Sequence, residues 1–166
     1  PLTISGQHNL VRNGGFEDLD TCPYSDNQVH FAYPWNYQKN YTYPWRGLGT
    51  VDLFHSCATI TPNSQYYPPD WFFGVPKNFD GYQYPHSGQG YAGIYLFGFY
   101  YYNTSNYYNI QEYLQIQLTE ELKEGKHYCY QYFISPTLPQ LWYGAHLLAK
   151  EFSVLLTDTP VSRFCI

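Results

Sequence analysis

The stretch that decides the fold reads VPKNFDGYQ over residues 75–83 and, after a short gap, SGQGYAGI over residues 87–94. Glycines recur in it among residues that favour strands. A glycine in such a setting marks a tight turn or a point where another strand approaches closely. The stretch therefore predicts short strands joined by sharp turns, as in a β-sandwich, and its residues are not typical of an active site.

Alternating apolar and polar residues on both sides of this stretch predict further strands. We expect an aromatic strand pair over 91–102 around Gly98, and single strands at 8–17, 48–57, 127–134 and 149–157, of which the first runs into a turn at Gly14–Gly15. No long segment has the 3.6-residue periodicity of an amphipathic helix. The pattern predicts an all-β, antiparallel sandwich or barrel, and the residues alone do not choose between the two.

The composition fits one domain, residues 1–166, with an unusually aromatic surface. Charged residues make up 13% of the 166 residues and aromatic residues 22%, with 21 tyrosines. A typical domain has about 25% charged residues. Tyrosine combines a large apolar ring with a polar tip, so a tyrosine-rich surface can bind sugars or proteins. The alternative is that most of these rings fill the two faces of a sheet.

Charge and hydropathy exclude several kinds of partner. The net charge is −5 and the eight Lys and Arg residues are scattered, so binding to nucleic acid is not expected. No apolar run approaches the roughly 20 residues that cross a bilayer. The given residues contain no segment with the charged, apolar and small-residue parts of a leader, so we expect the leader of an exported chain to have been removed already. The chain starts at Pro1 and contains no methionine, which suggests a processed or partial chain.

The four cysteines favour disulfides over a zinc site. They lack the Cys-x-x-Cys spacing and the histidine partners of structural zinc. We favour a Cys22–Cys57 bond because both residues lie in the turn-rich first half of the chain. A bond between Cys129 and Cys165 is a second option, with a buried free thiol at Cys129 as its alternative. Such bonds indicate an oxidising compartment.

Residues of catalytic type are dispersed. The acidic residues Asp52, Asp70, Asp80, Glu112 and Glu151 have no spacing that would bring a pair together, and the six histidines are isolated. Ser56 follows His55, and Ser87 follows His86, but neighbours in a strand point to opposite faces. We therefore expect no enzymatic activity.

Two loop-like segments carry a tryptophan beside a charged residue. Trp45 precedes Arg46, and Trp71 follows Asp70. Sugar rings stack on exposed indole rings, so each pair could form a ligand-binding platform with a polar anchor. The alternative is that the loops fold back and bury their own aromatic rings.

Several motifs appear in the order found in one family of bacterial surface domains. The chain resembles, from Asn9 to about Thr157, the galactose-binding-like jelly-roll domains of gliding-motility-associated and OmpA-associated bacterial surface proteins. The residues that carry this resemblance are the opening Asn-Gly-Gly-Phe-Glu at 13–17, Cys22-Pro23, Trp35, residues 49–57, the stretches at 75–78 and 87–93, Glu-Tyr-Leu-Gln at 112–115 and residues 125–129.

The resemblance implies an antiparallel jelly-roll β-sandwich, exported to a bacterial surface through type 9 secretion, without catalytic activity. Related domains hold a structural calcium between the opening glutamate, here Glu17, and an Asp-Asn pair in a later strand. This chain has Lys150 and Glu151 at the matching place. The lysine would put a positive charge where the ion sits, which argues against calcium at Glu17. No other cofactor is expected.

Family members continue with further strands beyond the point where this chain stops, at Ile166. An uncovered sheet edge favours a strand-completing partner chain or self-assembly. The sequence thus predicts a secreted or cell-surface module that binds a glycan or a surface protein through aromatic loops. The alternative is a structural subunit of a surface filament, coat, or secretion or gliding assembly.

Overall fold

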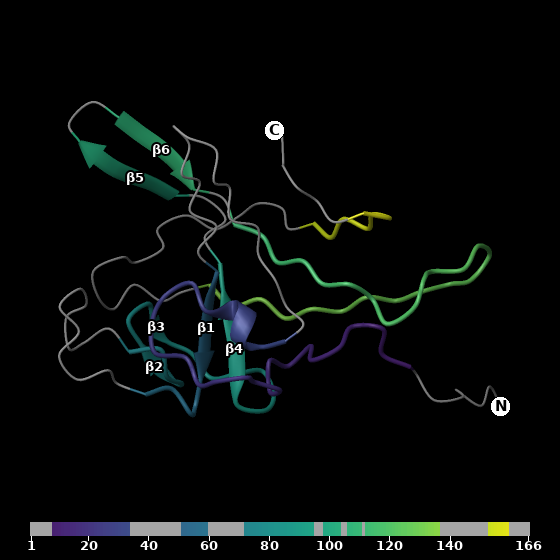
Figure 1. Cartoon of the computed structure of the whole chain (residues 1–166), viewed down its shortest axis with the longest axis horizontal. Coiled ribbons are helices and arrows are strands. Elements are labelled where there is room, and N and C mark those ends of the chain that lie inside the picture. The colour runs from purple at the N-terminus through teal and green to yellow at the C-terminus, as the bar shows by residue number, and fades with distance from the viewer. Residues whose placement is uncertain are drawn as a thin grey trace.

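The computed structural model of the chain describes residues 8–33, 51–59, 72–94, 112–136 and 153–159, and the backbone of 98–103 and 106–110 (Figure 1). Its regular elements are the short 3-10 helix η1 (Val29–Phe31) and the strands β1 (Asp52–His55), β2 (Lys77–Asn78), β3 (Gly81–Tyr82), β4 (Gly90–Gly93), β5 (Gly98–Asn103) and β6 (Asn106–Ile110). The described residues form no α-helix, and none of their helices is long and apolar enough to cross a membrane.

The strands pair in three antiparallel two-stranded sheets: β1 with β4, β2 with β3, and β5 with β6. The β1–β4 register places Phe54 opposite Tyr91 and His55 opposite Gly90. The strand-dominated structure agrees with the predicted all-β class. A jelly-roll sandwich remains a prediction, because its continuous sheets are not formed by the described residues.

Strand β1 is buried on both faces. All four of its residues are buried. Val51, just before β1, packs with Val29, Phe16 and Leu114, whereas Phe54 packs with Phe73, Phe79 and Tyr91. Successive side chains of a strand point to opposite faces, so these two clusters cover the two sides of β1. The core of the described region is therefore centred on this strand.

The glycines of β4 make room for large side chains of β1. A Cβ atom at Gly93 would overlap the Phe54 ring, and one at Gly90 would overlap the His55 ring. Gly90 stands directly opposite His55, and Gly93 stands diagonally opposite Phe54. The two rings can therefore lie flat against the β4 backbone. This explains the Gly-x-x-Gly spacing of the stretch that decided the fold.

Tyr91 of β4 joins the second cluster to the β2–β3 hairpin. Its hydroxyl accepts a hydrogen bond of 2.6 Å from the Asn78 side-chain amide. The same amide donates to the Gly74 backbone carbonyl, and the Asn78 side-chain oxygen accepts from the Asp80 and Gly81 N–H groups. Burial raises the pKa of Tyr91 to about 12. The buried asparagine thus fixes the hairpin turn onto the core.

The predicted strand at 8–17 is wrong, because the chain turns there. Residues 12–15 form a turn, closed by a hydrogen bond from the Phe16 N–H to the Asn13 carbonyl. Asn13 and Phe16 take positive φ angles of 49° and 61°. The predicted turn at Gly14–Gly15 is confirmed. The residues before it belong to no strand.

The strands predicted to pair with each other over 91–102 correspond to β4 and β5, which belong to two different sheets. β4 pairs with β1, and β5 pairs with β6, which follows it. Around residues 48–57, β1 confirms the predicted strand over 52–55.

Two other predicted strands are not formed. The first is the strand predicted over 127–134, and the second is the strand predicted over 149–157, of which the structure describes 153–157. Neither segment belongs to a sheet, and the side chains of both are exposed. Their alternation suits a strand, but neither segment pairs with the described sheets.

Candidate functional site

A hollow of about 340 Å³ lies beside the turn at 12–15, lined by Arg12, Asn13, Asp18 and Tyr33. Small-molecule sites typically begin at about 300 Å³. The lining residues come from two segments: the turn with the residues after it, and the chain just beyond η1. The hollow is therefore large enough for a compact ligand.

Asn13 ties the two segments together. Its side-chain amide donates to the Asp18 and Tyr33 carbonyls, both at 2.8 Å, and its side-chain oxygen accepts from the Asp18 N–H at 3.0 Å. The positive φ of Asn13 is one that asparagine tolerates better than most residues. Three hydrogen bonds from one side chain thus set the shape of the hollow.

The hollow combines an aromatic ring with two opposite charges. Tyr33 is 59% exposed, and the Arg12 guanidinium carbon lies 6.0 Å from the centre of its ring. Within the described chain neither the Arg12 guanidinium nor the Asp18 carboxylate has an ion-pair partner. The hollow therefore brings a donor side chain and an acceptor side chain of opposite charge together beside a largely exposed tyrosine.

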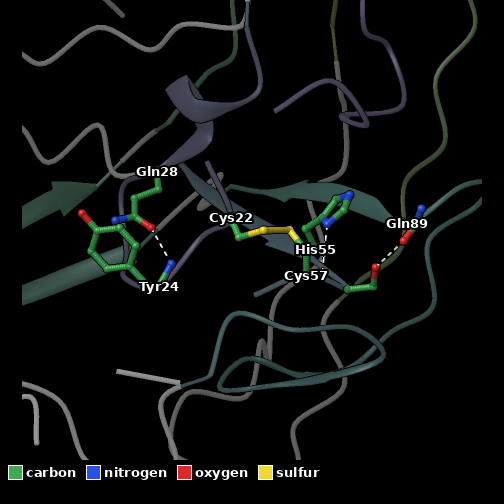
Figure 2. Close-up of a disulfide and its surroundings, with 7 residues drawn as sticks. Cys22, Tyr24, Gln28, His55, Cys57 and Gln89 are labelled. Carbon is green, nitrogen blue, oxygen red and sulfur yellow. Dashed lines mark hydrogen bonds between the residues drawn. A yellow bond between two sulfur atoms is a disulfide. The ribbon is translucent and has the colours of Figure 1, made fainter. Parts of the chain in front are cut away.

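The predicted Cys22–Cys57 disulfide is confirmed. The two Cα atoms are 5.6 Å apart, and the bond joins the loop before η1 to the end of β1 (Figure 2). Next to it, the Gln28 side-chain oxygen accepts hydrogen bonds from the Tyr24 and Ser25 N–H groups at 2.7 and 2.9 Å. Cys129 is a free and exposed thiol, so the optional bond to Cys165 and the alternative of a buried thiol are both wrong; Cys165 itself lies outside the described residues.

His55 and Ser56 do not form a nucleophile–base pair. His55 is buried, and its Nδ1 accepts a hydrogen bond from the Cys57 N–H at 3.1 Å (Figure 2). The exposed Ser56 hydroxyl instead donates to the Gln89 side-chain oxygen at 2.7 Å. Burial lowers the pKa of His55 from 6.5, with the Glu17 carboxylate opposing the shift. The histidine is therefore held in its neutral form beside the disulfide.

Glu17 caps the start of β4. Its Oε1 accepts hydrogen bonds from the Gln89 and Gly90 N–H groups at 2.7 and 3.2 Å. Gly88 has a φ of 68°, and a Cβ there would overlap the Glu17 carboxylate. Among the described residues no group of three or more His, Cys, Asp or Glu side chains is placed to hold a metal ion. The argument against calcium at Glu17 comes from the sequence and stays a prediction, and the role that the structure gives Glu17 is to cap β4.

Acidic side chains that are distant in the sequence meet around β1. Asp52 is 3% exposed and Glu112 is also buried. Burial raises the pKa of Asp52 well above 3.8, and the charges of Asp80, Glu112 and Asp26 raise it further, while a hydrogen bond from the Asn27 N–H opposes the shift. No pattern in the sequence signals this acidic group, because its members share no regular spacing.

Trp45, Arg46, Asp70 and Trp71, the predicted ligand-binding residues, lie outside the described residues, and so does Trp35. Their roles stay predictions. The hollow at Tyr33 has a similar chemical make-up, an exposed tyrosine beside charged side chains, but no sequence pattern points to Tyr33 as a binding residue. The only signal was the turn at Asn13-Gly14-Gly15, flanked by Arg12 and Asp18.

Exposed tyrosines also occur on the second half of the described chain. The Tyr82 and Tyr84 rings meet edge to face, with a hydrogen bond of 3.0 Å between their hydroxyls. Tyr130 and Tyr132 stack with their ring centres 6.0 Å apart. No charged side chain is part of either pair. They are accessory candidates, because neither pair lines the hollow at Tyr33.

No family model, no curated protein and no solved structure matches the chain. The resemblance to the galactose-binding-like jelly-roll domains therefore stays a prediction, and the function has to be inferred from the arrangement of the residues.

Proposed function

We propose that the chain is an exported, non-catalytic module that binds a neutral glycan at a bacterial surface, with the hollow at Tyr33 as its binding site. The observation that supports it is the 59% exposed ring of Tyr33 beside Arg12. A pyranose presents an apolar C–H face, which packs on a phenol ring, and hydroxyl groups that both donate and accept hydrogen bonds.

The charges of the hollow fit a neutral ligand. Arg12 donates only and the Asp18 carboxylate accepts only, so together they complement hydroxyl groups, which do both. Their charges cancel, and an anionic or cationic sugar would meet one favourable and one unfavourable neighbour. A neutral oligosaccharide is thus the ligand class that the lining residues favour.

The proposed export has support from the Cys22–Cys57 bond, because disulfides persist in oxidising compartments. The proposal of a non-catalytic role rests on the separation of the reactive side chains. His55 is buried and bonded to the Cys57 N–H, and Ser56 bonds to Gln89. Type 9 secretion is proposed from the family resemblance alone.

Screening the full chain on a glycan array, with a Tyr33→Ala variant, tests the proposal. We expect neutral glycans to be bound, and Tyr33→Ala to weaken the binding at least about tenfold, which corresponds to one lost stacking contact of about 1.4 kcal/mol. The melting temperature should change little, since the ring is exposed. Tyr84→Ala, at another exposed tyrosine, is the matched control and should bind as the unmodified chain does. Equal binding by Tyr33→Ala would refute this site.

A second function, that of a structural subunit, has its own observation. Two extended segments expose apolar side chains, namely Tyr130, Phe133 and Ile134 in one and Val154, Leu155 and Leu156 in the other. Exposed apolar side chains in neighbouring positions are typical of surfaces that bind other chains. We propose assembly with further chains as the alternative to glycan binding.

A further inference from the structure

The Tyr82 and Tyr84 side chains form an exposed pair of phenols at the end of β3. Their ring centres are 5.5 Å apart, and the planes of the rings meet at 85°. The Tyr82 hydroxyl donates a hydrogen bond of 3.0 Å to the Tyr84 hydroxyl. Tyr82 is 44% exposed and Tyr84 is 62% exposed. The hydroxyl ends of the two rings therefore lie together on an exposed part of the chain.

The backbone around Gln83 holds this pair in place. Tyr82 lies opposite Lys77 in the β2–β3 register. The Gln83 N–H donates to the Pro76 carbonyl at 2.7 Å, and the Gln83 side-chain oxygen accepts from the Ser135 hydroxyl at 2.6 Å. Residues two apart in an extended chain point to the same side, so an anchored Gln83 leaves the two tyrosines next to each other. The hairpin thus sets the approach of the two rings.

We infer that Tyr82 and Tyr84 are a site of oxidative modification, at which a peroxidase and hydrogen peroxide join the two rings of one chain in a dityrosine cross-link. The peroxide takes one electron and one proton from each phenol and leaves as two molecules of water. The two phenoxyl radicals then form a carbon–carbon bond between the ring positions next to their oxygens. The hydrogens at these two carbons move to the oxygens, so both hydroxyls are restored and the chain has lost two hydrogen atoms.

The arrangement of the two phenols favours this bond over bonds between chains. In a dityrosine the two hydroxyls flank the new bond, so they lie side by side, as those of Tyr82 and Tyr84 already do. Tyr130 and Tyr132 are a contrasting pair, because their rings are stacked with planes 8° apart and centres 6.0 Å apart. Groups held together in a suitable geometry react much faster than the same groups on separate molecules. The Tyr82–Tyr84 bond should therefore form first.

The cross-link would be a second covalent constraint beside the Cys22–Cys57 disulfide. The strands β2 and β3 have two residues each, so their pairing contributes few hydrogen bonds. A bond between Tyr82 and Tyr84 would restrict the chain at the end of this short hairpin. Disulfides persist in oxidising compartments, and the same surroundings suit the oxidation of phenols. Both cross-links thus agree with one environment.

The test is treatment of the full chain, at low protein concentration, with a peroxidase and hydrogen peroxide. A Cys129→Ser background is used, because the free and exposed Cys129 thiol would consume the oxidant. We expect dityrosine fluorescence from the monomer. The proteolytic peptide that contains both tyrosines should lose two hydrogen atoms and give no fragment ions from cleavage between Tyr82 and Tyr84.

Variants that lack one phenol show which residues react. Tyr82→Phe and Tyr84→Phe keep the ring, and each should lower the fluorescence of the monomer at least about fivefold, because the pair that proximity favours is gone. Tyr130→Phe, at another exposed tyrosine, is the matched control and should leave the fluorescence unchanged. Equal fluorescence in Tyr84→Phe, or a peptide that keeps its two hydrogen atoms, would overturn the inference. Cross-links that form only between chains would overturn it as well.

Discussion

Asp52 is buried in β1, and among the described residues its carboxylate accepts one hydrogen bond, from the Asn27 N–H at 2.8 Å. Burial, followed by the charges of Asp80, Glu112 and Asp26, raises its pKa well above 3.8 in the folded chain. The folded state therefore holds this proton more tightly than the unfolded state does. This tighter binding of the Asp52 proton stabilises the folded state fully below pH 3.8, and the stabilisation is lost as the pH rises through the raised pKa.

Replacing Asp52 by asparagine should remove this part of the pH dependence of the unfolding free energy. The Asn side-chain oxygen can still accept from the Asn27 N–H, and no charge remains to be buried. We expect Asp52→Asn to be about 1–3 kcal/mol more stable than the unmodified chain at pH 7 and close to it at pH 4. Urea unfolding at the two pH values measures the difference. Asp20→Asn, at an exposed carboxyl, is the control; an equal effect of both variants, or a less stable Asp52→Asn at pH 7, would contradict the account.

Asn13 shows why the candidate site could not be predicted residue by residue. The sequence indicates a turn at 13–15, and the turn is present. The hollow depends on the Asn13 amide bonding to the carbonyl of Tyr33, 20 residues away. Nothing in the spacing of the two residues signals such a bond, because it depends on where η1 returns the chain.

At the scale of elements, the disulfide connects the loop at Cys22 to the end of β1 at Cys57, across 35 residues. In the chain-entropy account, a loop of this length contributes about 3–4 kcal/mol by restricting the unfolded chain. The loop also contains η1, whose Val29 packs against Val51 just before β1. The bond therefore secures a segment that has little regular structure of its own.

A Cys22→Ser and Cys57→Ser double variant should lose about 3–4 kcal/mol of unfolding free energy. Urea unfolding under non-reducing conditions measures it. Cys129→Ser is the control, since that thiol is free and exposed, and it should change the stability by less than about 0.5 kcal/mol. A loss below about 1 kcal/mol in the double variant would mean that the loop is held by its other contacts.

The strands divide into those that the sequence could predict and those that it could not. β1 and β4 were predictable because a buried strand and its glycine-bearing neighbour leave a residue pattern, which Phe54 and Gly93 illustrate. Residues 127–134 have the same alternation but no partner in the described sheets. Alternation reports that a segment can pair, and it does not report with what. The partner depends on contacts between residues that are distant in the sequence.

At the scale of the whole molecule, the described chain has two parts of different character. One is the buried core around β1 and β4, which carries the disulfide and the hollow. The other is the excursion over 117–136, whose side chains are exposed except for that of Leu118 (Figure 1). Glycan binding is proposed for the first part and assembly with further chains for the second. The two proposals use separate surfaces, so one molecule could do both, as multivalent adhesion requires.

The measurement that tests the central claim most directly is an amide NMR titration of the full chain with the neutral glycan that binds best on the array. We predict that the largest shifts fall on residues 12–18 and on Tyr33, where the hollow lies. Shifts centred elsewhere, for example on Tyr82 and Tyr84, or an unchanged spectrum at saturating glycan, would contradict the claim that this hollow binds a sugar.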